Sequence, residues 1–169
     1  KDAMRFRRNI ERIGEIFAYE ISKKMTYENN DITTPLGISS ESLMIEKPVL
    51  ATILRAGLPL HQGLLNYFDS SENCFISAFR KHNRGGDFEI KIEYMSSPEL
   101  EGKTVILCDP MMATGSSMVL AMEALLSKGN PKHIHVVVTI ASSEGIQYFK
   151  ENLPFRNCTL WLGAEDKEM

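Results

Sequence analysis

The sequence predicts an α/β fold in which a mainly parallel, twisted β-sheet is flanked by helices. Short apolar segments without alternation recur along the chain, and most are followed by a segment with apolar residues at helical spacing. Continuous apolar runs are typical of strands that are covered on both faces, and a strand followed by an amphipathic helix is the unit of a parallel sheet. The length of 169 residues indicates a single domain over residues 1–169.

The N-terminal part predicts one long helix and then a polar connection. Apolar residues at spacings of three and four form a stripe along a helix over residues 4–25, for which Asp2 is a suitable N-cap. The stripe consists of Phe6, Ile10, Ile13, Phe17 and Ile21. The polar stretch that follows ends in Thr34–Gly37, whose residue types favour a turn rather than a regular element.

Two buried strands and an arm are predicted in the middle of the chain. The apolar runs at residues 48–54 and 74–79 are typical of buried strands, and a loop that carries His61 precedes the helix between them. Residues 88–94 then alternate strictly between apolar and charged side chains, from Phe88 to Tyr94. This alternation predicts that residues 81–94 form a half-exposed β-hairpin arm.

The C-terminal part repeats the pattern of strand and helix. Apolar strands are predicted at residues 104–108, 133–141 and 158–162. Helices are predicted between them, from residue 117 to a stop at Gly129 and over residues 143–152.

Composition and charge argue against several classes of partner. No apolar run reaches the length of a membrane-spanning helix, and a formal net charge of −3 gives no basic excess for nucleic acid. We therefore expect neither a membrane nor a nucleic-acid partner. The three cysteines form no CxxC pair and no even disulfide set, which favours a reducing cytoplasm. Since the chain starts at Lys1, we expect both ends to be cut back from a longer protein.

A lone acidic residue and a turn of small residues follow the strand at residues 104–108. Ligands bind at the carboxyl ends of strands in such sheets, and Asp109 is the first polar residue after this strand. Residues 113–117 then enter a helix, so that backbone N–H groups, hydroxyls and the helix N-terminus favour an anion such as phosphate. The alternative is an ordinary connection with Ser116 or Ser117 as the N-cap. Neither GxGxxG nor GxxxxGK[ST] occurs here.

The segment DPMMATGSS, residues 109–117, resembles the phosphoribosyl diphosphate signature of type I phosphoribosyltransferases. Its Asp-Pro start is the form found in uracil phosphoribosyltransferases. TILRAGL (residues 52–58), FRK around Arg80, TPLG (residues 34–37), FAYE and EGKTVILCDP resemble the corresponding segments of that family, in the same order. The resemblance covers essentially the whole chain and implies a type I phosphoribosyltransferase-like fold with a β-hairpin arm.

The resemblance implies an enzyme that makes UMP and diphosphate from uracil and 5-phospho-α-D-ribose 1-diphosphate. It implies Mg²⁺ bound mainly through the diphosphate, without dedicated protein ligands, a homo-oligomer (a dimer or larger), and GTP as an effector in some relatives. The family's uracil-contacting segment is expected beyond Met169. Two alternatives stay open: a phosphoribosyltransferase for another nucleobase, and a non-catalytic regulator that keeps the phosphoribosyl site and presents a basic face to RNA.

The same resemblance assigns roles to individual residues. Arg55, Arg80 and Asp109 form the expected catalytic set, in which the arginines bind the diphosphate and Asp109 binds the ribose hydroxyls. A solvated surface charge is the alternative for each arginine. The arm is expected to fold over the site or to reach a second subunit, with a plain surface hairpin as the alternative. The residues expected to bind phosphoribosyl diphosphate are Arg55, Ala56, Gly57, Arg80, Asp109, Pro110, Met111, Met112, Ala113, Thr114, Gly115, Ser116 and Ser117.

His133 and His135 share one face of a predicted strand. A metal-binding pair is the weaker interpretation because the sequence offers no third ligand nearby. We expect them to lie at the edge where the strand begins.

Overall fold

The computed structural model describes residues 2–82 and 88–167, and within these ranges it describes every side chain except those of residues 79–82 and 88–91. The helices are α1 (Ala3–Ser22), α2 (Leu58–Leu65), α3 (Ser116–Leu126) and α4 (Ser143–Glu151). The strands are β1 (Tyr27–Thr34), β2 (Gly37–Met44), β3 (Val49–Leu54), β4 (Asn73–His82), β5 (Phe88–Ser96), β6 (Thr104–Met112), β7 (His133–Ser142) and β8 (Cys158–Asp166).

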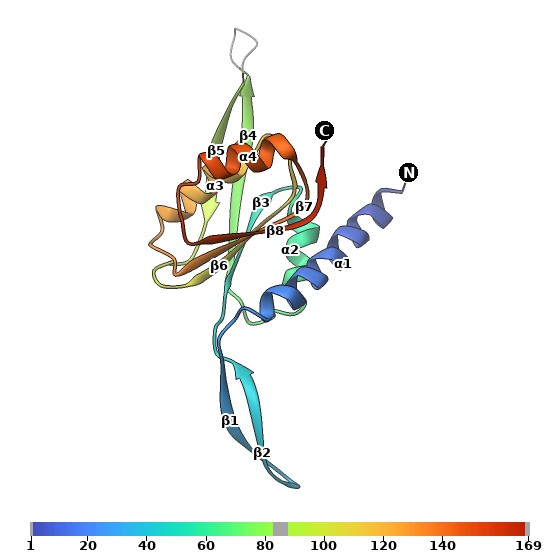
Figure 1. The fold of residues 1–169 in the computed structure, drawn as a ribbon, viewed down its shortest axis with the longest axis vertical. Coiled ribbons are helices and arrows are strands. Elements are labelled where there is room, and N and C mark those ends of the chain that lie inside the picture. The colour runs from blue at the N-terminus through green and yellow to red at the C-terminus, as the bar shows by residue number, and fades with distance from the viewer. Residues whose placement is uncertain (1, 83–87, 168–169) are drawn as a thin grey trace.

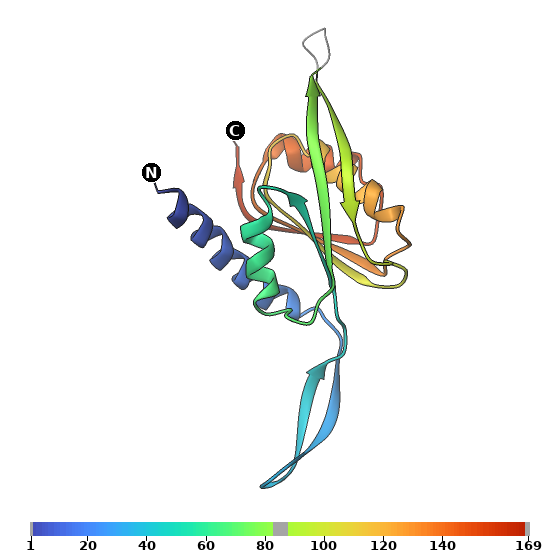
Figure 2. The same ribbon diagram turned by 180° about the vertical axis from the view of Figure 1, so that it is seen from behind.

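The central sheet has the strand order β5-β4-β3-β6-β7-β8 and helices on both faces (Figures 1 and 2). Neighbouring strands are parallel except for β5, which runs antiparallel to β4. α1 and α2 bury apolar side chains such as Phe17 and Leu60 on one face, and α3 and α4 bury Met122 and Phe149 on the other. The predicted α/β class with a mainly parallel sheet is confirmed.

α1 confirms the predicted helix and its N-cap. The Asp2 carboxylate accepts hydrogen bonds from the backbone N–H groups of Met4 and Arg5, at 2.9 and 3.2 Å. The helix ends at Ser22, three residues before the predicted end. Phe6 is 65% exposed, so its predicted place on the buried stripe is wrong; the first turns of α1 extend beyond the sheet (Figure 1).

The β1–β2 hairpin was not predicted, although its turn was. Residues 34–37 form the tight connection, and the register pairs Tyr27 with Met44 and Thr34 with Gly37. The hairpin projects from the body of the molecule (Figure 1), and its residues are exposed or half-buried on both faces. Because neither face is buried, the sequence carries no alternation that would indicate strands.

The arm predicted at residues 81–94 forms the outer part of the β4–β5 hairpin, and its tip at residues 83–87 lies outside the described residues. A register shift between Ser77 and Ala78 marks a bulge in the pairing. Ile92 packs against the core, whereas Tyr94 is 59% exposed. The prediction that Tyr94 continues the apolar face is therefore wrong, because a bulge reverses the side-chain alternation.

Glu46 joins the root of the β1–β2 hairpin to the central sheet. Its carboxylate accepts hydrogen bonds from the Thr26 N–H and hydroxyl and from the Thr104 hydroxyl, at 2.9, 3.0 and 3.0 Å. It also pairs with the Lys132 ammonium at 2.6 Å. Burial by itself raises the pKa of Glu46, but the hydrogen bonds from Lys132, Thr26 and Thr104 outweigh burial and lower this pKa to about 2.

We expect Glu46→Gln to lower the free energy of unfolding at neutral pH by about 1–2 kcal/mol. Because the folded-state pKa lies below the ordinary value of 4.5, this stabilisation is present above that value and is lost as the pH falls toward about 2. Urea unfolding of wild type and variant at neutral pH and near pH 3 measures the difference. A difference of equal size at both pH values would contradict the assignment.

No helix in the part of the chain that the structure describes is both long enough and apolar enough to cross a membrane.

Candidate functional site

β6 extends past its predicted end and carries Asp109 to the carboxyl edge of the sheet. Pairing with β7 continues to Met112, opposite Ala141. Pairing with β3 stops at Cys108, opposite Thr52. The side of β6 that faces β3 is therefore unpaired from Asp109 onward, and a cavity of about 230 Å³ lies here.

Most residues that line this cavity belong to the set expected from the sequence. The lining residues are Ala56, Asp109, Pro110, Met111, Met112, Ala113, Thr114, Gly115, Ser117 and Met118. Met118 is the addition, and it also belongs to the core. The structure thus brings the β6–α3 segment and the β3–α2 loop together around one cavity.

Asp109 is half-buried, just past the end of the stretch of β6 that pairs with β3. Burial raises the pKa of its carboxyl group to about 7. It is the acidic residue among the cavity's lining residues. A carboxyl group with this pKa titrates near neutral pH, and its ionised form accepts hydrogen bonds from ligand hydroxyls.

Gly115 shapes the turn between β6 and α3. Its φ of +77° lies in the left-handed region, and a Cβ at this position would lie 2.6 Å from the carbonyl oxygen of Gly145. Gly115 is also the N-cap of α3, so the alternative with Ser116 or Ser117 as the N-cap is wrong. Since no side chain caps this helix and Met118 N–H already donates to the Gly115 carbonyl oxygen, the N–H groups of Ser116 and Ser117 are the ones available to an anion.

The start of α4 supports the turn between β6 and α3. The Ser142 hydroxyl donates to the carbonyl oxygen of Ala113 and accepts from the N–H of Gly145. A Cβ on Gly145 would lie 2.5 Å from the Ala113 oxygen, so only glycine allows this approach. Sequence reasoning missed Ser142 and Gly145. The only signal was that Ser142 precedes a helix, which indicates an N-cap but not what lies beside it.

The β3–α2 loop presents Arg55 at the carboxyl edge. The Arg55 side chain is exposed, and it makes no hydrogen bond or ion pair with the side chains that the structure describes. The peptide bond before it is cis. Gly57 is required by its surroundings, because a Cβ there would lie 2.7 Å from the Ile53 carbonyl oxygen. The loop is therefore held close to β3 while the guanidinium stays accessible.

Arg80 lies in β4, past the last residue of β4 that pairs with β3. Its side chain lies outside the described residues. The backbone of Arg80 thus lies beyond the carboxyl end of β3.

The histidines lie away from this cavity. His61 lies in α2 and is 5% exposed, so its predicted place in a loop is wrong; burial lowers its pKa. His133 and His135 lie at the start of β7, as expected, with ring centroids 4.5 Å apart. The described residues contain no group of three His, Cys, Asp or Glu side chains that could hold a metal ion.

A family model and curated relatives indicate the same family for this chain. The family model described as uracil phosphoribosyltransferase matches residues 2–169. A uracil phosphoribosyltransferase of Porphyromonas gingivalis is 56% identical over 165 residues, which cover 98% of this chain and 76% of that protein.

Solved structures share the fold. A protein from Aquifex aeolicus superposes with a TM-score of 0.86 at 28% identity, over 98% of this chain and 77% of that one. A hypoxanthine phosphoribosyltransferase from Staphylococcus aureus gives a TM-score of 0.63 at 14% identity, over 96% of this chain and 75% of that one.

Proposed function

The chain belongs to the uracil phosphoribosyltransferase family, and we propose that Arg55, Arg80 and Asp109 carry its transfer of a phosphoribosyl group to uracil. The enzyme makes UMP and diphosphate from uracil and 5-phospho-α-D-ribose 1-diphosphate. Neither alternative, an enzyme for another nucleobase or a non-catalytic regulator, is supported by the family. The observation that supports this assignment is the cavity that Asp109 shares with the turn before α3 and with Ala56, the residue next to Arg55; neither arginine lines the cavity itself in the part of the chain that the structure describes.

The 5'-phosphate binds at the turn of residues 113–117. The first N–H groups of α3 donate to it, and the Thr114 and Ser116 hydroxyls, 2.8 Å apart, add donors. Asp109 accepts hydrogen bonds from the ribose hydroxyls. These contacts fix the sugar at the carboxyl edge of the sheet, with its C1 directed toward the β3–α2 loop.

Transfer then occurs at C1 of the ribose. A uracil nitrogen releases its proton to solvent or to the departing diphosphate and forms the new bond to C1, while the bond from C1 to the diphosphate oxygen breaks and its electron pair leaves with the diphosphate. Arg55 and Arg80 stabilise the negative charge that develops on this leaving group. No protein nucleophile is needed, so the residues act by positioning and electrostatics.

Mg²⁺ fits this site as an ion that arrives with the substrate. Asp109 is one carboxylate in a cavity otherwise lined by apolar, hydroxyl and backbone groups, which is too few protein ligands for a dedicated cage. Mg²⁺ carried by the substrate would supply charge neutralisation for the leaving diphosphate, and this chain would add no dedicated ligand beyond the Asp109 carboxylate. Removal of Mg²⁺ with EDTA is therefore expected to abolish diphosphate release.

We expect Ser142→Ala to raise the KM for phosphoribosyl diphosphate about two- to tenfold with little change in kcat. The lost hydrogen bond to Ala113 loosens the phosphate-binding turn without removing a ligand-contacting group. Ser143→Ala is the matched control, because the Ser143 hydroxyl bonds to Glu165 and not to the turn. Equal KM values for Ser142→Ala and Ser143→Ala would contradict this positioning role.

Base specificity is tested with the full-length protein, phosphoribosyl diphosphate and Mg²⁺. Diphosphate release is measured with uracil, hypoxanthine, guanine, adenine and xanthine. We expect turnover with uracil alone. Turnover with a purine and none with uracil would overturn the assignment.

The chain is further proposed to form a homo-oligomer, a dimer or larger. The β1–β2 hairpin supports this, because Ile38 is 75% and Leu36 fully exposed and an isolated two-stranded hairpin is only marginally stable in water. Light scattering should give a multiple of the chain mass, and Ile38→Asp should lower it. A monomeric wild type would contradict the oligomer, and an unchanged mass for the variant would contradict contact through the hairpin.

Two further proposals concern regulation and location. GTP as an effector is tested by titrating it into the uracil assay, where the initial rate is expected to rise. A cytoplasmic location is supported by Cys74, Cys108 and Cys158, which are unpaired in the structure.

A further inference from the structure

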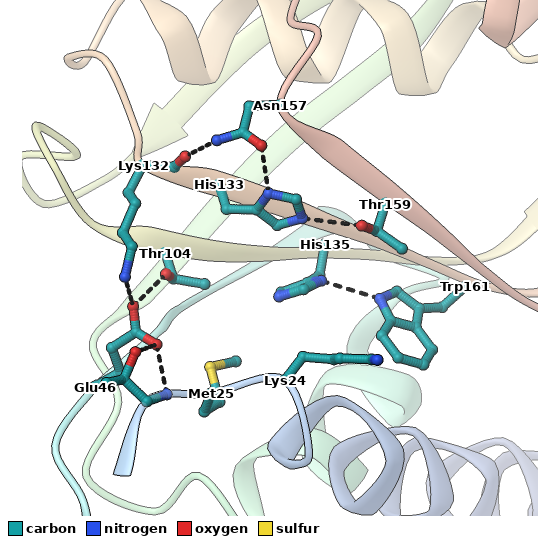
Figure 3. Close-up of a pocket in the computed structure, with 11 residues that line it drawn as sticks. Lys24, Met25, Glu46, Thr104, Lys132, His133, His135, Asn157, Thr159 and Trp161 are labelled. Carbon is teal, nitrogen blue, oxygen red and sulfur yellow. Dashed lines mark hydrogen bonds and ion pairs between the residues drawn. The ribbon is translucent and has the colours of Figure 1, made fainter. Parts of the chain in front are cut away.

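A second cavity, of about 380 Å³, lies at the edge of the sheet where β6, β7 and β8 begin. Asp109 lies near the opposite end of β6, so this cavity is separate from the proposed transfer site. We call it the amino-edge pocket. Its walls include Lys24 and Met25 after α1, Thr104 at the start of β6, and His135 and Trp161 on β7 and β8 (Figure 3).

Several polar groups of the amino-edge pocket already form hydrogen bonds or ion pairs with one another. The Glu46 carboxylate holds the four contacts described above, including its ion pair with Lys132. Both ring nitrogens of His133 are occupied, Nδ1 by the Asn157 side-chain oxygen at 2.8 Å and Nε2 by the Thr159 hydroxyl at 3.0 Å. These groups form a fixed wall (Figure 3).

His135 is different, because one of its ring nitrogens is left without a partner. The residue is 5% exposed, and its Nδ1 accepts a hydrogen bond from the indole N–H of Trp161 at 3.0 Å. Since an indole N–H only donates, Nδ1 carries no proton, and the neutral ring holds its proton on Nε2. Burial first, and then the neighbouring His133, lowers the pKa of His135 to about 4, so the ring is neutral at pH 7.

The Nε2–H of His135 makes no hydrogen bond to any residue that the structure describes. Figure 3 shows this nitrogen directed away from Trp161 and into the pocket. This N–H is open to the pocket and is not among the fully buried polar atoms without a partner, so a charged acceptor on a ligand can replace water at it and form a stronger hydrogen bond.

Charge and surface chemistry restrict that ligand further. Lys24 forms no ion pair within the described residues, whereas the adjacent Lys23 pairs with Glu20 at 2.7 Å. Among the residues that line the pocket, Lys24 and Lys132 are positively charged and Glu46 is negatively charged, so their net charge is +1 with the histidines neutral. The remaining surface is largely apolar, from the Met25 side chain and the Trp161 ring.

We propose that the amino-edge pocket binds a small organic monoanion with an apolar body, such as an aromatic carboxylate, whose acid group accepts from His135 Nε2–H and pairs with Lys24. The apolar body packs against Met25 and Trp161. A multiply charged phosphate ester fits less well, because the pocket offers one net positive charge. The proposal does not rest on the transfer reaction, since no residue of the amino-edge pocket takes part in it.

Trp161 borders the pocket and is the single tryptophan of residues 1–169, and comparison with Trp161→Phe separates its signal from any other tryptophan of the full-length protein. The full-length protein is titrated with benzoate, the probe monoanion, and with benzamide, its neutral analogue of similar shape. We expect a saturable change in Trp161 fluorescence with benzoate, and at least about tenfold weaker binding of benzamide, from loss of the charge-assisted contacts. No saturable change with benzoate, or equal binding of the two probes, would overturn the proposal.

Lys24→Gln and Lys23→Gln form a matched pair of variants. Lys24→Gln is expected to weaken benzoate binding about tenfold and to leave benzamide binding unchanged, whereas Lys23→Gln leaves both unchanged. Equal effects of the two substitutions would show that benzoate responds to general surface charge, which contradicts the proposed contact.

A further titration tests which of the two cavities binds benzoate. Phosphoribosyl diphosphate added at saturation is expected to leave the benzoate titration unchanged. A competitive shift of its midpoint would place benzoate at the Asp109 cavity and overturn the assignment to the amino-edge pocket. Failure of uracil turnover leaves this fluorescence result intact, so the two proposals are tested separately.

Discussion

Arg55→Ala is expected to lower kcat about 10²- to 10³-fold, with a much smaller change in the KM for uracil. Charge develops on the diphosphate only as its bond to C1 breaks, so a group that stabilises this charge acts mainly in the transition state. Arg55 suits this role because its side chain is exposed at the carboxyl edge and pairs with none of the described side chains. Steady-state kinetics of UMP formation, with each substrate varied in turn, measure the effect.

Two further variants make the Arg55 result specific. Arg55→Lys keeps the charge but loses the planar fork, so it should recover only part of the rate. Arg156→Ala removes an exposed arginine from the loop before β8 and should leave kcat unchanged. A loss of uracil affinity larger than the loss in kcat for Arg55→Ala would argue against diphosphate binding.

Asp109→Asn is expected to lower kcat/KM for phosphoribosyl diphosphate about 100-fold. The substitution turns two charge-assisted hydrogen bonds to ribose hydroxyls, of about 1.5–3 kcal/mol each, into neutral ones of about 0.5–1.5 kcal/mol each, a loss of about 2.5 kcal/mol in total. The variant should fold normally. Because burial raises the pKa of Asp109 to about 7, ionisation of this carboxyl opposes folding, and Asn is expected to leave the Tm at pH 8 equal or higher. Unchanged kinetics would refute the role of Asp109.

The pH dependence of the wild type follows from the same group. Below about pH 7 the carboxyl is increasingly protonated and loses acceptor capacity, so kcat/KM for phosphoribosyl diphosphate should fall as the pH decreases. Above this value the dependence should level off. The substrate phosphates also titrate, so the test is the ratio of wild type to Asp109→Asn across the pH range. A ratio independent of pH would show that Asp109 does not titrate in the free enzyme.

Local sequence signals predicted the strands and helices whose faces meet the core. The run at residues 49–54 has its first five residues buried, and α3 buries Val119, Met122 and Leu125 at the predicted spacing. Where no core is present, as in β1 and β2, the pattern carries no signal. At Tyr94 the sequence pattern was regular but the structure is not. One extra residue in the β4–β5 pairing turns Tyr94 to the opposite face from Ile92, although the sequence alternates without a break.

The sequence by itself determined the order of the elements, the family and the segment around Asp109, because periodicity and a contiguous motif are local properties of the chain. Only the tertiary structure decided how far β6 extends beyond its pairing with β3 and how deeply Asp109 is buried. It alone also showed that Ser142 and Gly145 support the turn at Ala113. The amino-edge pocket likewise combines the end of α1 with the starts of three strands. The burial of a side chain, its pKa and its hydrogen-bond partners depend on residues that are distant in sequence. Only the packing of the folded chain brings those residues together.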